Sequence, residues 1–443
     1  MKDELFLLIL RKSIIKDNLF EKILTKLRLE ILITLFKSDK KILKEHYEFI
    51  ISLSQQCFLN EYVFYQSDKE SIYINKLKNL IEIDNSIKEL EIVILSCFTP
   101  LNYSQIVVNK VSNYESKNVL FNNLITLQIK EPLREKKLLN SIKSIGEISD
   151  YVSQKVRSQY EENPYPRWRY TNNQLPANPI VIINSQIKPN KIKFNNNFNK
   201  SNVLIAGCGT GKHIYIAENY LNSNITAVDL SKASLAYAKR KIIESGINNV
   251  EFIHADILEL SKLNRKFDII ESVGVIHHMQ DPLVGLDILL NLLEPHGFLK
   301  LGLYSEIARS DVIEARKFIQ YNKFGSTIKD IRGVRQFIID EKENKLLQNI
   351  CQNGDFFSIS TVRDLIFHVQ EHRFTLSQLS KILSDFNLQF LGFIDLELKN
   401  KYSELYPDDK NNIYLKNWNQ FETKYPHTFN NMYKFWLKKI NNS

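Results

Sequence analysis

The stretch Asn202–Asp229, NVLIAGCGTGKHIYIAENYLNSNITAVD, decides the fold, because it reads as strand, glycine turn, helix, strand and acid. Val203–Ala206 is a short unbroken apolar run, which is typical of a parallel strand buried on both faces. Glycines follow at alternate positions, and they let the backbone turn tightly and let a ligand approach the main chain. The helix after the turn presents free N–H groups to that ligand. The three glycines are Gly207, Gly209 and Gly211.

A second strand, Ile225–Val228, ends in Asp229, 18 residues after Gly211. A carboxylate at this place accepts hydrogen bonds from both hydroxyls of a ribose. The turn and the acid together therefore predict a nucleoside-containing ligand.

The spacing of the turn separates the ligands that compete for it. A phosphate-binding P-loop needs Ser or Thr after its Gly-Lys, and here Gly211-Lys212 is followed by His213, which excludes that motif. A dinucleotide fingerprint needs a third glycine where Lys212 stands, so that interpretation is weakened and stays open.

Three more strands follow in order, and they extend the pattern over about a hundred residues. Asn249–His254 leads to Asp256, Phe267–Ile270 leads to Glu271, and Gly297–Tyr304 follows a helix that ends near Pro295. Strands that alternate with helices form a doubly wound parallel sheet, with the ligand at the carboxyl ends of its strands. We therefore predict an α/β, Rossmann-like fold for this part of the chain.

The Gly-x-Gly-x-Gly turn with its later acids resembles the motifs of the class I S-adenosyl-L-methionine (SAM)-dependent methyltransferases. The resemblance implies SAM as cofactor, with the adenine amino group on Asp256 and Ile257 packing on the ring. Ile205 is a departure, since the family usually carries an acid there that contacts the methionine part. The predicted cofactor-binding residues are Gly207, Cys208, Gly209, Gly211, Asp229, Leu230, Asp256, Ile257, Glu271 and Ser272, the last two at the lip of the fourth strand.

Segments outside the sheet extend the resemblance. QQCFLNEYVF, VRSQYEENPYPRW, SVGVIHHMQDP, GLYSEIAR and DLIFHVQEHRFT are similar to those of a bacterial methyltransferase group often fused behind tetratricopeptide repeats. The resemblance implies SAM-dependent transfer and brings no known acceptor with it. The chain has no recognisable repeats of its own.

Composition narrows the class of protein. The 443 residues are 44% hydrophobic and carry a formal charge of +9, but the basic residues are scattered, so nucleic acid is disfavoured as a partner. The four cysteines have no metal-ligand spacing, and we expect reduced thiols in a cytoplasmic protein and no metal. Neither a secretory signal nor a membrane span is expected.

We predict four parts along the chain. Residues 1–150 have helical periodicity and form a helical domain that could dock a protein partner, with a turn near Glu131-Pro132. Residues 151–200 are a proline- and aromatic-rich arm and linker, with a helix over Tyr151–Glu162 and a linker or strand-like stretch around Ile180–Ile183. The methyltransferase domain spans 201–400 with a helical insertion at about 305–374, and 401–443 form an aromatic helix that docks on the core.

The arm has two interpretations. Tyr165, Arg167 and Trp168 either cover the cofactor pocket as a lid, or belong to a spacer whose aromatic side chains are merely buried. His368 and His372 are four residues apart and would share a helical face if the helix persists, and we group them with the substrate wall. They do not form the HExxH zinc motif.

Methyl transfer is an in-line displacement, so holding nucleophile and methyl group in line and excluding water supply much of the catalysis. His277 and His278 follow the fourth strand and are our catalytic candidates, as a base or as residues that shape the pocket. The Asn/Asp-Pro-Pro-aromatic motif of amino-group methyltransferases is absent, and we expect a small or medium-sized methyl acceptor. An NAD-dependent oxidoreductase or epimerase, and a non-catalytic SAM-binding interaction protein, remain as alternatives.

Overall fold

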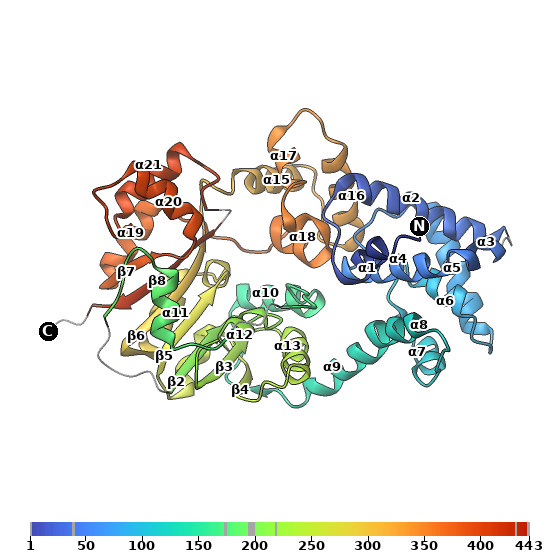
Figure 1. Cartoon of the computed structure of the whole chain (residues 1–443), viewed down its shortest axis with the longest axis horizontal. Coiled ribbons are helices and arrows are strands. Elements are labelled where there is room, and N and C mark those ends of the chain that lie inside the picture. The colour runs from blue at the N-terminus through green and yellow to red at the C-terminus, as the bar shows by residue number, and fades with distance from the viewer. Residues whose placement is uncertain are drawn as a thin grey trace. The chain divides into compact units, whose positions relative to one another are not determined.

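The computed structural model describes residues 2–37, 40–171, 175–193, 200–217, 219–429 and 432–440. The chain divides into two compact units (Figure 1). We call them the helical unit, Met1–Lys137 with Asp311–Phe367, and the sheet unit, Leu138–Ser310 with His368–Ser443. No helix among these described residues is long and apolar enough to cross a membrane.

The helical unit has one apolar core, which residues from both of its chain segments share. Arg335 joins the segments, since its guanidinium donates two hydrogen bonds of 2.9 Å to the carboxylate of Glu21, and both side chains are buried. Its helices are α1 (Glu4–Lys12), α2 (Asn18–Phe36), α3 (Lys40–Glu45), α4 (Tyr47–Leu59), α5 (Asp68–Ile83), α6 (Glu89–Leu95), α7 (Gln105–Ser112), α8 (Val119–Ile125), α9 (Glu131–Leu139), α15 (Ser310–Tyr321), α16 (Ile328–Asp340), α17 (Lys345–Ile350) and α18 (Ile359–Ile366).

This division differs from the predicted domains. Residues 311–367, most of the predicted insertion, share the apolar core of the N-terminal helices. The periodicity of α16 shows a helix with one apolar face, but it cannot tell which core that face joins. The predicted turn at Glu131-Pro132 is also wrong, because α8 continues through a π-helical turn, Thr126–Lys130, into α9. Pro132, which has no N–H to donate, follows this π-helical turn inside the continuous helix.

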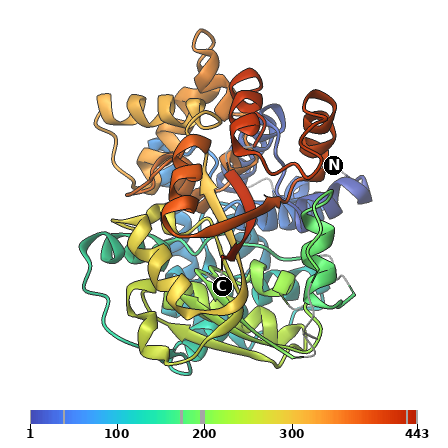
Figure 2. The same cartoon turned by 90° about the vertical axis from the view of Figure 1, so that its left-hand side faces the viewer.

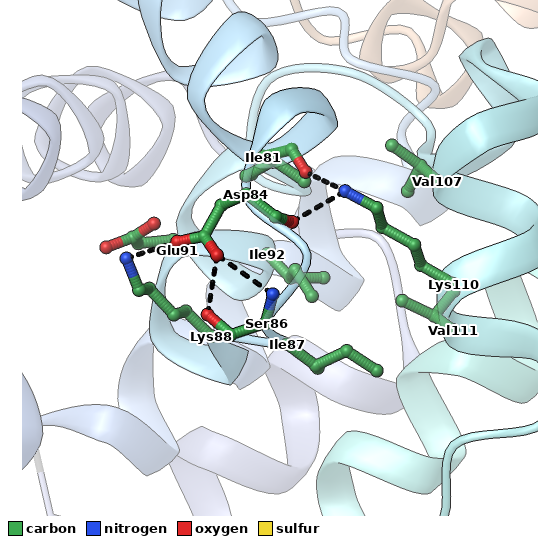
Figure 3. Close-up of a pocket in the computed structure, with 10 residues that line it drawn as sticks. All are labelled: Ile81, Asp84, Ser86, Ile87, Lys88, Glu91, Ile92, Val107, Lys110 and Val111. Atoms are coloured by element: carbon green, nitrogen blue, oxygen red, sulfur yellow. Dashed lines mark hydrogen bonds and ion pairs between the residues drawn. The ribbon is translucent and has the colours of Figure 1, made fainter.

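A lysine caps the end of α5 in the helical unit (Figure 3). Lys110 Nζ donates to the carbonyl oxygens of Ile81, Glu82 and Asp84 at 2.7, 2.8 and 2.7 Å. The adjacent cavity has a volume of about 10 Å³, enough for about one water molecule. The cavity is therefore too small for a cofactor.

The sheet unit is built on eight strands in the order β1-β4-β3-β2-β5-β6-β8-β7, all parallel except β8. The chain moves outward from β2 through β3 and β4, then returns to β5 on the other side of β2. This change of direction creates the crevice where ligands bind in doubly wound sheets, so the predicted fold is confirmed. The strands are β1 (Lys143–Ser144), β2 (Ser201–Ala206), β3 (Ser223–Asp229), β4 (Val250–His254), β5 (Phe267–Val273), β6 (Leu293–Tyr304), β7 (Leu388–Phe393) and β8 (Met432–Lys439).

Helices cover both faces of the sheet. One apolar layer includes residues of α14, α19 and α21, and the other includes residues of α11, α12 and α13. The helix predicted at Tyr151–Glu162 is confirmed as α10, whereas the stretch around Ile180–Ile183 lies in a helix and not in an extended arm. The helices of the sheet unit are α10 (Tyr151–Glu162), α11 (Pro179–Gln186), α12 (Lys212–Ala217), α13 (Lys232–Glu244), α14 (Pro282–Leu292), α19 (Leu376–Asp385), α20 (Leu396–Leu405) and α21 (Leu415–Lys424).

The C-terminal segment corrects another prediction. Instead of one aromatic helix over 401–443, the chain forms α21 and then β8, which inserts antiparallel between β6 and β7 (Figures 1 and 2). Tyr433, Phe435 and Leu437 join one apolar layer, and Trp436 joins the other. Side chains that alternate between two buried faces produce an aromatic-rich run without helical period, which explains the error.

Candidate functional site

The glycine turn connects β2 to α12 in backbone conformations that favour glycine. Gly207, Gly209 and Gly211 have φ values of +81°, +52° and +88°. A Cβ atom on Gly211 would lie 2.8 Å from the Cβ of Ala238, which is closer than real Cβ atoms approach. The turn is tied to β3, because the N–H groups of Gly207 and Cys208 both donate to the carbonyl oxygen of Val228 at 2.9 Å.

Cys208 lies inside the turn as a buried side chain, and burial raises the pKa of its thiol well above the usual value. The thiol is therefore protonated near neutral pH and is a poor nucleophile. Its small size fits the packed side of the turn.

The arm after α10 lies on this turn. A Cβ atom on Gly209 would lie 2.7 Å from the carbonyl oxygen of Tyr165. Thr210 donates through its hydroxyl to the carbonyl oxygen of Pro166, and Trp168 Nε1 donates to the carbonyl oxygen of Thr210 at 3.0 Å. Tyr237 holds the arm from the other side by donating its hydroxyl to the carbonyl oxygen of Trp168. The arm is thus fastened to the turn by main-chain contacts.

Two of the predicted lid residues, Tyr165 and Trp168, therefore lie beside the turn. Trp168 is buried, with 7% of its surface exposed, and the Tyr165 and Arg167 side chains are half-buried. The buried Trp168 side chain agrees with the spacer interpretation. The main chain of the arm lies on the glycine turn, and the lid interpretation stays a prediction.

Asp229 lies at the end of β3 against the turn. Its Oδ2 accepts from the N–H of Gly209 at 2.8 Å, and its Oδ1 accepts from the N–H of Ser231 at 2.9 Å. Burial raises the pKa of Asp229 to about 6, and the charge of Glu161 adds to the rise while the amide hydrogen bonds oppose it. Each oxygen of a carboxylate offers about two acceptor positions, so both can still accept from the hydroxyls of a ribose.

Asp256 and Ile257 follow β4. Asp256 is 3% exposed, its Oδ1 accepts from the N–H of Leu258 at 3.0 Å, and burial raises the pKa of its carboxyl. Ile257 is buried and Leu230, after β3, is half-buried. An apolar side chain beside a carboxylate fits a planar base that carries an amino group, so these residues fit the adenosine part of a SAM molecule.

Glu271 and Ser272 lie in the last three residues of β5. Both are buried, with exposed fractions of 1% and 0%. The strand continues to Val273 because its residues pair with β6 up to Gly302. Ser272 Oγ has no hydrogen-bond partner among the described residues.

The histidine pair follows β5 in a short 3-10 helix, Ile276–His278. His277 Nε2 lies 3.2 Å from His278 Nε2, and His278 Nδ1 lies 2.7 Å from the carbonyl oxygen of Gln370. A carbonyl only accepts, so His278 carries its proton on Nδ1, and its Nε2 accepts from His277 when the ring is neutral. The two rings therefore hold each other in defined tautomers.

His277 is completely buried, and burial together with the charges of His278 and Arg309 lowers the pKa of its imidazole well below the usual value. It is neutral near pH 7, and it cannot touch an acceptor without rearrangement. His278 is 5% exposed. The geometry therefore favours a role in shaping the site over a role as the base.

The pair belongs to a column of stacked groups. The Tyr304 ring lies 3.9 Å from the His277 ring, and the His368 ring stacks on His278 with centroids 3.6 Å apart. His368 Nδ1 accepts from the N–H of Gln370 at 3.2 Å, so its Nε2 carries the proton and donates to the Tyr160 hydroxyl at 3.1 Å. The column connects the end of β5 to the arm, because the Tyr160 and Tyr165 rings are stacked 6.5 Å apart.

A buried ion pair, Arg309 with Glu371, packs against the Tyr304 end of the column. Arg309 lies over the Tyr304 ring at 3.7 Å and donates to both carboxylate oxygens of Glu371, at 3.1 and 2.8 Å. These two residues and Tyr304 were missed among the predicted site residues. The only available signal was their presence in the quoted segments GLYSEIAR and DLIFHVQEHRFT.

His368 and His372 do not share a helical face, because α18 ends at Ile366. Only His368 enters the column. His372 lies on the strap 368–374, where its N–H donates to the carbonyl oxygen of His277 at 2.8 Å.

Comparison with known proteins gives the following. Residues 203–297 match the family model of a methyltransferase domain. The chain is 30% identical over 203 residues to an uncharacterized protein from Synechococcus, covering 44% of this chain and 48% of that protein. It is 35% identical over 80 residues to (S)-tetrahydroprotoberberine N-methyltransferase from Eschscholzia californica, covering 18% and 23%. The structure of PKMT2 from Rickettsia typhi is 20% identical with a TM-score of 0.49, covering 63% and 56%.

The chain spans about half the length of the first of these relatives, and less of the second. The matched segment runs from β2 to the start of β6, and so contains the glycine turn, both acids and the histidine pair. The sheet unit therefore contains a methyltransferase domain, and the cofactor of this domain is S-adenosylmethionine.

Proposed function

We propose that the sheet unit transfers a methyl group from SAM to a small or medium-sized acceptor. The observation that carries the proposal is the hydrogen bond from the N–H of Gly209 to Asp229 Oδ2, at 2.8 Å. This bond joins the glycine turn to the acid and leaves acceptor positions on the carboxylate for a ribose. It supports a nucleoside ligand at the crevice beside β2.

We assign the cofactor contacts as follows. Asp229 accepts from the ribose hydroxyls, and Asp256 accepts from the adenine amino group while Ile257 packs on the ring. Gly207 and Gly209 let the turn pack closely, since a side chain there would meet Val275 or the Tyr165 carbonyl oxygen. SAM supplies a methyl group on a sulfonium, which needs no phosphate-binding loop.

The remaining residues would position the acceptor and exclude water. The arm lies on the turn, and the column of Tyr304, His277, His278 and His368 joins the arm through Tyr160. Rigid walls of this kind hold reacting atoms in line, which is worth several orders of magnitude in rate. The walls that the sheet unit builds around its own crevice favour a small or medium-sized acceptor.

Equilibrium titration of the full chain with S-adenosylhomocysteine tests the assignment of Asp229. Asp229→Asn removes a charge-assisted acceptor, whose hydrogen bonds contribute about 1.5 to 3 kcal/mol to binding. We therefore expect the dissociation constant to rise about 10- to 100-fold. Asp287→Asn is the matched control, because Asp287 is exposed and contacts Asn291 on the same helix. Equal affinities in wild type and Asp229→Asn would refute the ribose contact.

A further inference from the structure

Four residues form a row across neighbouring strands beside the glycine turn. Ile205 of β2 pairs with Glu271 of β5, Glu271 pairs with Lys300 of β6, and Lys300 pairs with Trp436 of β8. Residues that pair directly in a sheet project to the same face. Ile205 and Trp436 belong to the apolar layer under α11, α12 and α13, so the carboxylate and the ammonium group lie in that layer too.

Glu271 and Lys300 are buried, with 1% and 7% of their surfaces exposed. Glu271 Oε1 accepts from the Tyr220 hydroxyl at 2.5 Å, and Glu271 Oε2 lies 3.3 Å from Lys300 Nζ. Although it forms this ion pair, Oε2 accepts no hydrogen bond from any described residue. Buried polar atoms are nearly always hydrogen-bonded, so this oxygen indicates a missing donor.

The row lies near the carboxyl ends of two strands, since Glu271 is two residues before the end of β5 and Lys300 is four residues before the end of β6. Lys434 pairs with Gly302, two residues beyond Lys300, and its side chain is exposed. His213, in the first turn of α12, is half-buried, and burial lowers the pKa of its imidazole to about 4. His213 is therefore neutral near pH 7.

We propose that Glu271 and Lys300 bind the amino acid end of the cofactor, with its ammonium group on Glu271 Oε2 and its carboxylate on Lys300. A buried pair of opposite charges 3.3 Å apart complements a zwitterion, whose two charged groups are separated by a similar distance. Ile205 offers no carboxylate, and Glu271 supplies one at the same level of the sheet, one strand away. The inference rests on the proposed function, because it assigns a subsite for the same cofactor.

The test compares two ligands on the full chain. S-adenosylhomocysteine carries the amino acid end, whereas 5′-methylthioadenosine shares its adenosine part and lacks that end. We expect Glu271→Gln to weaken S-adenosylhomocysteine at least tenfold and to leave 5′-methylthioadenosine within twofold. Glu251→Gln is the matched control on the exposed side chain of β4, and it should change neither affinity.

Tyr220→Phe provides a milder variant if Glu271→Gln does not fold. It keeps both charges and removes one hydrogen bond to Glu271, so we expect a loss of about threefold for S-adenosylhomocysteine alone. Equal effects on the two ligands, or no effect of Glu271→Gln on either, would show a purely structural ion pair and overturn the inference. A wild-type chain that binds neither ligand would instead refute the proposed function.

Discussion

The two halves of the crevice in the sheet unit are built in different ways. On the side of β2, β3 and β4, the site consists of main-chain N–H groups, glycines and two acids, one at the end of β3 and one two residues after β4. On the side of β5 and β6, the buried Glu271–Lys300 pair lies within the strands, and beyond the strand ends the site consists of side chains that stack on one another. The residues of this second half come from α10, the end of β5, the end of β6 and the strap 368–374.

This contrast separates two physical requirements. A cofactor shared by many proteins is bound by backbone geometry, which short local motifs specify. A particular acceptor needs a wall of its own shape, and here that wall depends on contacts between residues 62 to 208 positions apart in sequence. If the two halves are independent, a substitution in one half should leave the function of the other unchanged.

The largest effect should come from the cofactor half. Gly209→Val places a branched side chain at φ +52°, where its Cβ would lie 2.7 Å from the Tyr165 carbonyl oxygen. We expect S-adenosylhomocysteine binding to weaken more than about 100-fold, because strain of about 1 to 3 kcal/mol adds to the clash and the turn must move. Calorimetric titration measures the loss.

Gly246→Val is the control for Gly209→Val. Gly246 has a φ of +73° but nothing within 4 Å of an added Cβ, so it isolates the backbone strain. We expect it to lower stability and to leave the affinity unchanged. A similar loss of binding in both variants would mean that contact with the arm is irrelevant.

The next effect should fall on stability and spare the cofactor. Arg309→Met leaves Glu371 buried without its bidentate partner, so we expect the free energy of unfolding to drop by about 3 to 5 kcal/mol. Arg373→Met removes a half-buried partner of the same carboxylate, at 3.3 Å, and should cost less than about 1 kcal/mol. Denaturant unfolding and cofactor titration of both variants are the measurements.

If the two halves are independent, folded Arg309→Met binds S-adenosylhomocysteine within about twofold of wild type. A tenfold loss at full folding would contradict the contrast, because it would show that the column also shapes the cofactor pocket.

The smallest effect is a pH dependence confined to the cofactor half. Burial raises the pKa of Asp229 to about 6, so the carboxyl is increasingly protonated below pH 6 in the free protein. A protonated group is a poorer acceptor, so we expect the cofactor affinity to fall by no more than about tenfold in all between pH 6 and pH 4. Titrations of wild type and Asp229→Asn over this range check it, and the variant should show no such fall.

The same group should act oppositely on the stability of the cofactor-free protein. The pKa of Asp229 is higher in the folded chain than its ordinary value of 3.8, so the folded state binds more protons between these two values. The contribution of Asp229 to stability therefore rises as the pH falls from about 6 to about 4. His277 acts in the opposite direction, because its lowered pKa keeps it neutral in the folded chain while the unfolded chain takes up a proton below about pH 6.5, so its contribution to stability falls as the pH falls.

The sequence predicted the sheet because its motifs are local. Val203–Ala206, the three glycines and Asp229 lie within 28 residues, and their period and spacing determine strand, turn and acid directly. Local motifs did not predict the residues whose role depends on a partner far away in the sequence. The residues around Arg309 do not indicate that it pairs with Glu371, and the sequence of α16 does not indicate that Arg335 pairs with Glu21.

The C-terminal error has a related cause. In Met432–Lys439, Tyr433, Phe435 and Leu437 are buried on one face, and on the other Trp436 is buried while Lys434 is exposed, so Trp436 interrupts the alternation of a half-exposed strand. The position of β8 between β6 and β7 depends on strands that are distant in sequence. A strand inserted in this way becomes predictable only when the other strands are already placed.

The most direct test of the account is calorimetric titration of the full chain with SAM, S-adenosylhomocysteine and NAD. We predict micromolar binding of the first two ligands and none of NAD, because the glycine turn and Asp229 fit a nucleoside without a pyrophosphate. Binding of NAD without binding of SAM or S-adenosylhomocysteine would contradict the assigned chemistry while leaving the fold unchanged.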